Sequence, residues 1–108
     1  MKSGRKEIAE AIAAFIREND LAQVFGGDVD LANNFSRPGK HYSVLLSRRS
    51  TLDGVVRVFS PARIHVMTKG PLGFGSTTFT SGEQAIEFLR LAFVEFDRAA
   101  AHKFINKK

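Results

Sequence analysis

Residues 41–81 carry the pattern from which the fold class follows, and they read HYSVLLSRRSTLDGVVRVFSPARIHVMTKGPLGFGSTTFTS. Apolar residues recur at every second position in three runs, Tyr42 to Leu46, Val56 to Val58 and Ile64 to Val66. A period of two places alternate side chains on opposite faces, as in a half-buried strand. The run Phe74 to Thr80 is a fourth candidate, because its serines and threonines suit a solvated pleat. This stretch therefore predicts about four antiparallel strands.

Turn-forming residues separate these runs. We expect the first hairpin turn at residues 50–54, a corner at Ser60 and Pro61, and a second turn at residues 69–73. Serine, aspartate, glycine and proline favour such reversals. Residues 26–40, which are rich in asparagine and glycine, are predicted to be a long connection.

Helical periodicity flanks the strands on both sides. An N-terminal amphipathic helix is predicted from apolar residues that recur every three or four positions, namely Ile8, Ala11, Ile12, Phe15 and Ile16. After the strands, a capping signature of Thr80 with Glu83, or of Ser81 with Gln84, opens a long helix over about residues 82–103. The resulting order predicts an α+β fold, in which helices cover one face of an antiparallel sheet.

The composition indicates one small folded domain. A chain of 108 residues fits a single domain spanning residues 1–108, with residues 1–6 and 104–108 as candidates for disordered tails. The chain has no cysteine, so it has no disulfide and no thiolate nucleophile, which agrees with a reducing compartment. No apolar run approaches the roughly 18 to 20 residues of a membrane span. We expect a cytoplasmic protein without a membrane contact.

Positive charge is concentrated in the middle of the chain. The whole sequence has a formal net charge of +5. Between residues 37 and 81, Asp53 is the single acid, and the bases are Arg37, Lys40, Arg48, Arg49, Arg57, Arg63 and Lys69. A basic excess of this kind indicates a polyanionic partner.

Strand alternation places part of this charge on the side of the sheet that the helices leave open. The predicted nucleic-acid contacts are Arg49, Arg57, Arg63, His65 and Lys69. Such donors satisfy phosphates without reading sequence, and bases can stack on exposed rings. The candidate rings are Tyr42, Phe59, Phe74 and Phe79. The same charges are also compatible with a plain solvated surface that discourages aggregation at sheet edges.

The order of elements over roughly residues 41–98, strands followed by a capped long helix, resembles the single-stranded-DNA-binding fold of Whirly-type proteins. The resemblance is one of element order, and the N-terminal helix is an addition to it. It implies binding to single-stranded DNA.

Two apolar features indicate contact with other proteins. Leu72 and Phe74 lie in the glycine-rich segment of residues 70–75, which is predicted to be a contact loop. Leu91 and Val94 fall opposite the main apolar stripe of the long helix. A lone surface helix shows only one stripe, so either the N-terminal helix or a second subunit must cover these residues. The sequence thus allows a homodimer interface at Leu91 and Val94.

The sequence carries no specific catalytic motif. Three histidines, His41, His65 and His102, have no carboxylate at ligand spacing nearby, so no metal site and no cofactor are predicted. The prediction is a small non-enzymatic binding module whose basic sheet face engages nucleic acid. The alternative is a protein-interaction module or dimeric regulator with an acidic partner.

Overall fold

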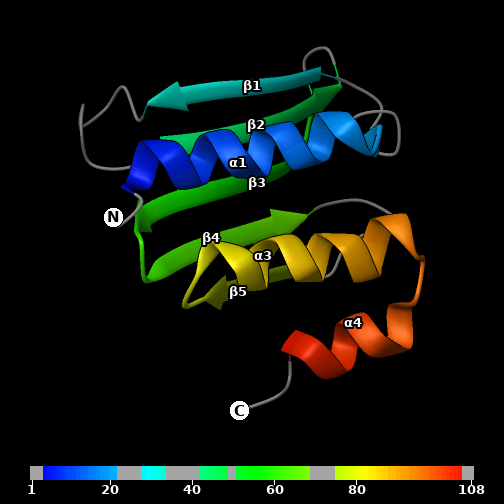
Figure 1. Ribbon diagram of the computed structural model, residues 1–108. Coiled ribbons are helices and arrows are strands. Elements are labelled where there is room, and N and C mark those ends of the chain that lie inside the picture. The colour runs from blue at the N-terminus through cyan, green and yellow to red at the C-terminus, as the bar shows by residue number, and fades with distance from the viewer. Residues whose placement is uncertain (1–3, 22–27, 34–41, 49–50, 69–74, 106–108) are drawn as a thin grey trace.

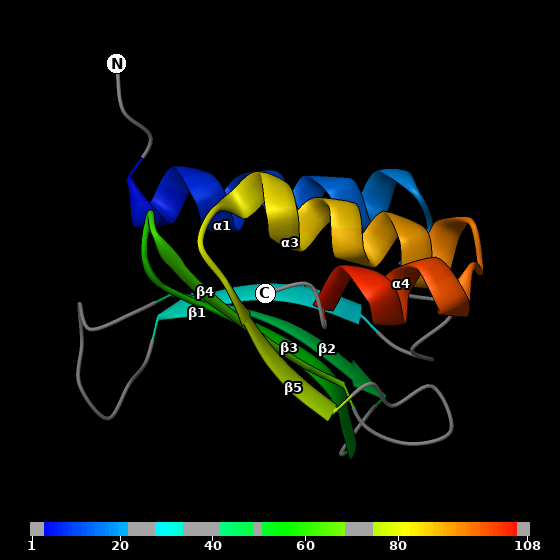
Figure 2. The same cartoon turned by 90° about the horizontal axis from the view of Figure 1, so that it is seen from below.

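Two layers make up the computed structural model, a sheet and a set of helices packed on one of its faces (Figures 1 and 2). The structure describes residues 4–21, 28–33, 42–48, 51–68 and 75–105. One antiparallel sheet of five strands has the order β1-β2-β3-β4-β5, so each strand pairs with its neighbour in sequence. The α+β class is therefore confirmed. No described helix is both long and apolar enough to cross a bilayer.

The elements have the following bounds. The helical segments are α1 (Arg5–Glu18), α3 (Gly82–Leu89), the π-helical η2 (Arg90–Val94) and α4 (Arg98–Ile105). The strands are β1 (Asp28–Asn33), β2 (Tyr42–Arg48), β3 (Thr51–Ser60), β4 (Arg63–Thr68) and β5 (Gly75–Phe79). Parts of both candidate tails are helical, because α1 begins at Arg5 and α4 ends at Ile105.

The strand β1 corrects the prediction of a long connection over residues 26–40. Asp28–Asn33 pairs with β2 in a register that runs from Asp28 opposite Ser47 to Asn33 opposite Tyr42. Val29 and Leu31 are half-buried and pack against the core. Two apolar residues among aspartates and an asparagine make too short an alternation to outweigh the turn-forming residues around them.

The hairpin between β2 and β3 is also tighter than predicted. Thr51 to Gly54 belong to β3 and not to a turn, since Thr51 pairs with Arg48 and Gly54 with Leu46. The corner at Ser60 is confirmed: β3 ends there, β4 begins at Arg63, and the Ala62 amide donates to the Ser60 hydroxyl at 3.2 Å. The predicted turn at residues 69–73 lies outside the described residues.

The start of α3 uses the second of the two predicted capping signatures. The Gln84 amide donates to the Ser81 hydroxyl at 3.2 Å, which caps the helix. The Gln84 side-chain oxygen reaches back one residue further than expected and accepts from the Thr80 amide and hydroxyl, each at 2.9 Å.

The long helix predicted over residues 82–103 is wrong, because the chain turns after η2. Phe96 adopts a left-handed backbone with φ of 55°. The Asp97 amide donates to the Leu91 carbonyl at 2.9 Å, which closes the end of the helix. Asp97 then caps α4 by accepting from the Ala100 amide at 3.0 Å. Neither glycine nor proline marks this break in the sequence.

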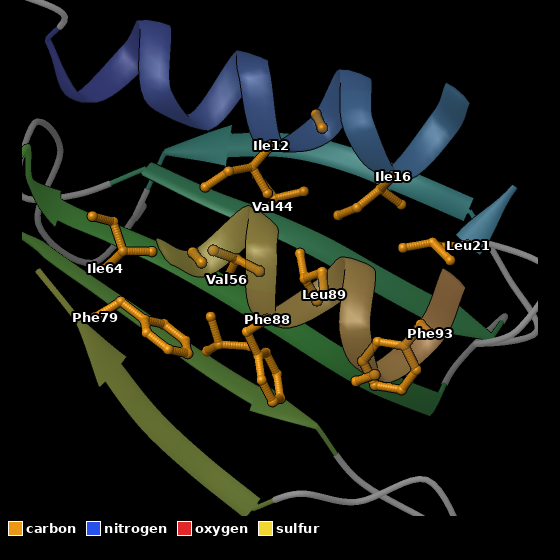
Figure 3. Packing of buried hydrophobic residues seen from close by; sticks show 14 of the residues in the cluster. Ile12, Ile16, Leu21, Val44, Val56, Ile64, Phe79, Phe88, Leu89 and Phe93 are labelled. Carbon is orange, nitrogen blue, oxygen red and sulfur yellow. The ribbon is translucent and has the colours of Figure 1, made fainter. Parts of the chain in front are cut away.

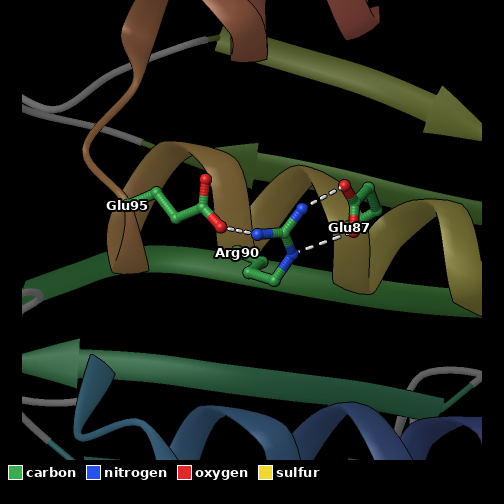
Figure 4. Close-up of polar contacts among 3 residues, drawn as sticks. All are labelled: Glu87, Arg90 and Glu95. Atoms are coloured by element: carbon green, nitrogen blue, oxygen red, sulfur yellow. Dashed lines mark hydrogen bonds and ion pairs between the residues drawn. The ribbon is translucent and has the colours of Figure 1, made fainter.

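Arg90 links the last turn of α3 to the turn after η2 (Figure 4). Its Nε donates to Glu87 Oε1 at 3.0 Å, and its other two nitrogens contact Glu87 Oε2 and Glu95 Oε2. The hydrogen bond from Arg90 is the main cause that lowers the pKa of the Glu87 carboxyl below its ordinary value. Because all three side chains are partly exposed, this network fixes local geometry more than it stabilises the fold.

The hydrophobic core fills the space between the helices and the sheet (Figure 3). It is built from Ile12 and Ile16 of α1, Phe88 and Leu89 of α3, and the inward residues of the strands, which are Val44, Val56, Val58, Ile64, Val66 and Phe79. Each fully buried side chain of this size contributes about 1.5 to 3 kcal/mol. The helices α1 and α3 therefore cover one face of the sheet and leave the opposite face uncovered.

Candidate functional site

The open face of the sheet, meaning the face opposite α1 and α3, carries a row of polar side chains, of which Ser43 is only 7% exposed. In register, Ser43 of β2 lies opposite Arg57 of β3, Arg57 opposite His65 of β4, and His65 opposite Thr78 of β5. Their neighbours Val44, Val56, Val58, Ile64, Val66 and Phe79 point into the core, so these four residues point the other way. Adjacent strands lie about 4.8 Å apart, so the polar row runs about 14 Å across the sheet.

Arg63 extends the polar row towards the corner between β3 and β4. It precedes His65 by two residues on the same strand, so both side chains share the open face. The Arg63 guanidinium carbon lies 5.0 Å from the centre of the Phe59 ring. The strand register shifts between Val58 and Ser60, and Phe59 is the extra residue of this bulge. The bulge thus supplies an aromatic ring to a basic surface.

The electrostatics of the cluster formed by Arg57, Arg63 and His65 favour a bound anion. Neither arginine forms an ion pair with any side chain that the structure describes. Partial burial, followed by the charges of Arg57 and Arg63, lowers the pKa of the His65 imidazole. The histidine is therefore neutral at pH 7, and Arg57 and Arg63 place two positive charges beside it.

An apolar row lies next to the polar row on the open face. Leu45 of β2 is opposite Val55 of β3, and Val55 is opposite Met67 of β4. Val55 is only 1% exposed although it does not belong to the helix-side core. The centre of this apolar row is therefore buried, and the accessible part of the open face is its polar row.

Three of the predicted contact residues come together on this face, and two of the candidate rings do not. Arg57, Arg63 and His65 share the open face, as the strand alternation predicted. The prediction that Phe79 is an exposed ring for base stacking is wrong, because Phe79 is 5% exposed and packs on Phe88 at a ring-centre distance of 5.5 Å. The same prediction for Tyr42 is also wrong, because Tyr42 is half-buried and packs against the helix-side core.

The other predicted contacts lie outside the described residues. They are Arg49 and Lys69 of the basic set and Leu72 and Phe74 of the contact loop.

Leu91 and Val94, the two residues of the predicted subunit interface, lie in different environments. Leu91 is half-buried and packs against the core of its own chain. Val94 is 36% exposed, and Phe96, two residues further on, is 66% exposed. Val94 and Phe96 are the exposed large hydrophobic residues among the side chains that the structure describes.

Sequence reasoning missed Ser43, Thr78 and Phe96. The positions of Ser43 and Thr78 depend on the strand register, which alternation within one strand does not set. Phe96 was missed because the predicted helix ran through it.

A hollow of about 440 Å³ lies between α1, the Pro61 corner and the start of α3, and it is lined mainly by Ile8, Ala11 and Ile86, with Glu7 and Glu83 beside them. No three histidine, aspartate or glutamate side chains among the described residues are grouped for a metal ion.

Comparison of the chain with protein-family models, with curated proteins and with solved structures finds no match. The functional argument therefore rests on the chemistry of the open face.

Proposed function

We propose that the open face binds nucleic acid through its phosphates, with single strands preferred and no sequence specificity. The observation that supports this most directly is the cluster of Arg57, Arg63 and His65, whose two arginines form no ion pair with any side chain that the structure describes. A phosphate backbone supplies the missing negative charge.

The preference for single strands follows from Phe59 and from the shape of the surface. The Phe59 ring beneath Arg63 can take part in stacking with an unpaired base, which a duplex keeps inside its helix. Among the described residues, the open face presents no helix that could enter a major groove, and direct reading of duplex sequence would need such an element or a protruding ribbon.

The test is a titration with a fluorescent single-stranded oligonucleotide at several salt concentrations. Replacing Arg57 and Arg63 by alanine should weaken binding by about 10-fold for each arginine, since a charge-assisted hydrogen bond contributes about 1.5 kcal/mol or more. The slope of log K against log salt should fall by about 0.7 for each phosphate that the variant no longer neutralises.

The matched control replaces Lys6 and Lys103 by alanine. Both lysines are exposed, and α1 and α4 lie on the helix side of the sheet, so this variant loses the same charge from the other side of the molecule. Its affinity should change little. If the wild type binds neither DNA nor RNA at about 50 mM salt, where non-specific contacts are strong, the proposal is wrong.

A second candidate function is contact with another protein through Val94 and Phe96. Their adjacent exposure on one turn is the observation that favours it. Binding centred on these side chains would depend weakly on salt and would be lost in Phe96→Ala, whereas nucleic-acid binding would be unaffected by that change. A cytoplasmic location for either function stays a prediction from the absence of cysteine.

A further inference from the structure

Strand β5 ends the sheet with one side unpaired. It pairs with β4 from Ile64 opposite Phe79 to Thr68 opposite Gly75, and no described residue pairs with its outer side. An edge strand presents a row of backbone donors and acceptors that can take up a further strand. The outer edge of β5 can therefore pair with an extended segment of chain.

β5 also lacks three of the features by which edge strands avoid such pairing. It contains no charged residue and no proline, and its register with β4 has no bulge. The strand at the other edge, β1, contains Asp28 and Asp30. Charges, prolines and bulges are the common protections of an edge, so only β5 is suited to pair with another strand.

A groove of about 560 Å³ runs beside this edge. It is lined without any charged side chain by Thr77, Thr78, Phe79, Thr80, Gln84, Phe104 and Ile105. Phe104 and Ile105 are half-buried residues of α4, and α4 lies on the helix side of the sheet (Figure 2). The groove thus adds an apolar wall to the unpaired backbone.

We propose that the outer edge of β5 pairs antiparallel with β5 of a second copy of this chain. An uncharged strand meets its own copy without repulsion. With Thr77 on the two-fold axis, Thr77 faces Thr77 of the second copy and Ser76 faces Thr78 of the second copy, and hydroxyl pairs of this kind stabilise sheets. Gly75 then lies opposite Phe79 of the second copy.

The two-fold pairing makes one sheet of twice the width, with both open faces on the same side. Three strand spacings would separate β4 from its counterpart, so the two His65 clusters would lie about 15 Å apart. Residues Phe104 and Ile105 would flank the junction on both sides of the axis and add apolar area, which a specific dimer needs beyond backbone hydrogen bonds. The dimer does not depend on the proposed nucleic-acid binding.

The first experiment measures the mass of the protein by light scattering during size-exclusion chromatography. The wild type should be a dimer at micromolar concentration. The double variant Ser76→Lys, Thr78→Lys should be a folded monomer, because both side chains are exposed and the pairing would set lysine opposite lysine.

The matched control adds two lysines away from the edge, as Ala11→Lys with Ala62→Lys, at two exposed positions. This variant should remain a dimer. A second measurement uses Thr77→Cys in a chain that has no cysteine of its own. Mild oxidation should join two chains covalently, since residues facing each other across an antiparallel pair lie within disulfide range, whereas Ala62→Cys should not.

A monomeric wild type would overturn the proposal and leave the edge to an extended segment of a different protein. A dimer that survives both lysines at the edge and gives no Thr77→Cys cross-link would overturn it as well, and would place the interface elsewhere.

Discussion

Gly82 lies so close to Ile8 that a Cβ atom on Gly82 would come within 2.9 Å of Ile8 Cγ2. The contact joins the first turn of α3 to the first turn of α1, where the two helices approach each other on the sheet. Ile8 is branched at Cβ, so its methyl group has little freedom to move aside. A side chain at position 82 must therefore displace one helix from the other.

The variant Gly82→Ala should lower the free energy of unfolding by about 1 to 2 kcal/mol, because overpacking outweighs the better helix propensity of alanine. Urea denaturation measures the change. In an Ile8→Ala background the same substitution should be neutral or stabilising. Equal losses in both backgrounds would show that the Gly82 to Ile8 contact is not the cause.

Replacing Phe96 by glycine should raise stability by about 0.5 to 1 kcal/mol. The Phe96 backbone is left-handed with φ of 55°, a conformation that glycine adopts without steric cost, and the ring is 66% exposed and so contributes little to the core. Asp20 has the same φ, and Asp20→Gly should gain less, because aspartate tolerates this region better. Thermal unfolding compares the two variants, and a clear loss of stability in Phe96→Gly would contradict the account.

The Glu87 carboxyl should titrate below its ordinary pKa, and the hydrogen bond from Arg90 is the chief reason. A lowered pKa in the folded state adds stability that is present above the unfolded pKa, about 4.5, and is lost as pH falls through the folded pKa. In Arg90→Gln the pKa should return towards its ordinary value and stability should fall less between neutral and acidic pH. NMR titration of the side-chain carboxyl measures both proteins, and an unchanged Glu87 pKa would refute this.

Oligonucleotide binding should strengthen as pH falls towards 5. Partial burial and the neighbouring arginines lower the pKa of His65, and a phosphate beside Arg57 and Arg63 would offset their charges and raise it again. Protonation and binding therefore favour each other at pH values between the free and bound pKa. His65→Asn should flatten this dependence at constant ionic strength, measured by the same fluorescence titration. If a steep pH dependence persists in His65→Asn, groups other than His65 cause it.

Much of the sheet was predictable because its strands show clear alternation. Val56, Val58, Ile64 and Val66 fix which faces of β3 and β4 are buried, and the positions of Arg57 and His65 follow from them. Phe79 was not predictable in this way, because a single apolar residue among serines and threonines does not set the phase of β5. β1 was missed for a related reason, since Val29 and Leu31 alone do not outweigh the polar residues beside them.

The break after η2 depends on interactions that the local sequence pattern does not indicate. Its left-handed residue is an aromatic one, and the helix ends through backbone hydrogen bonds and the contacts of Arg90 with Glu87 and Glu95. Such tertiary and capping contacts override a helical periodicity that continues through residues 90–103. The register that brings Ser43 and Thr78 into line with Arg57 and His65 likewise arises between strands and not within one.

The strictly sequential pairing of the five strands bears on how the chain folds as it is synthesised. Helix α1 packs on β1, β2 and β3, all of which are complete once residue 60 has left the ribosome. We therefore expect the nascent chain to bury the apolar stripe of α1 on a partial sheet before α3 exists, because hairpins between neighbouring strands close quickly. Synthesis then adds β4 and β5 in spatial order, so the strand with the unpaired edge is also the last to join the growing sheet.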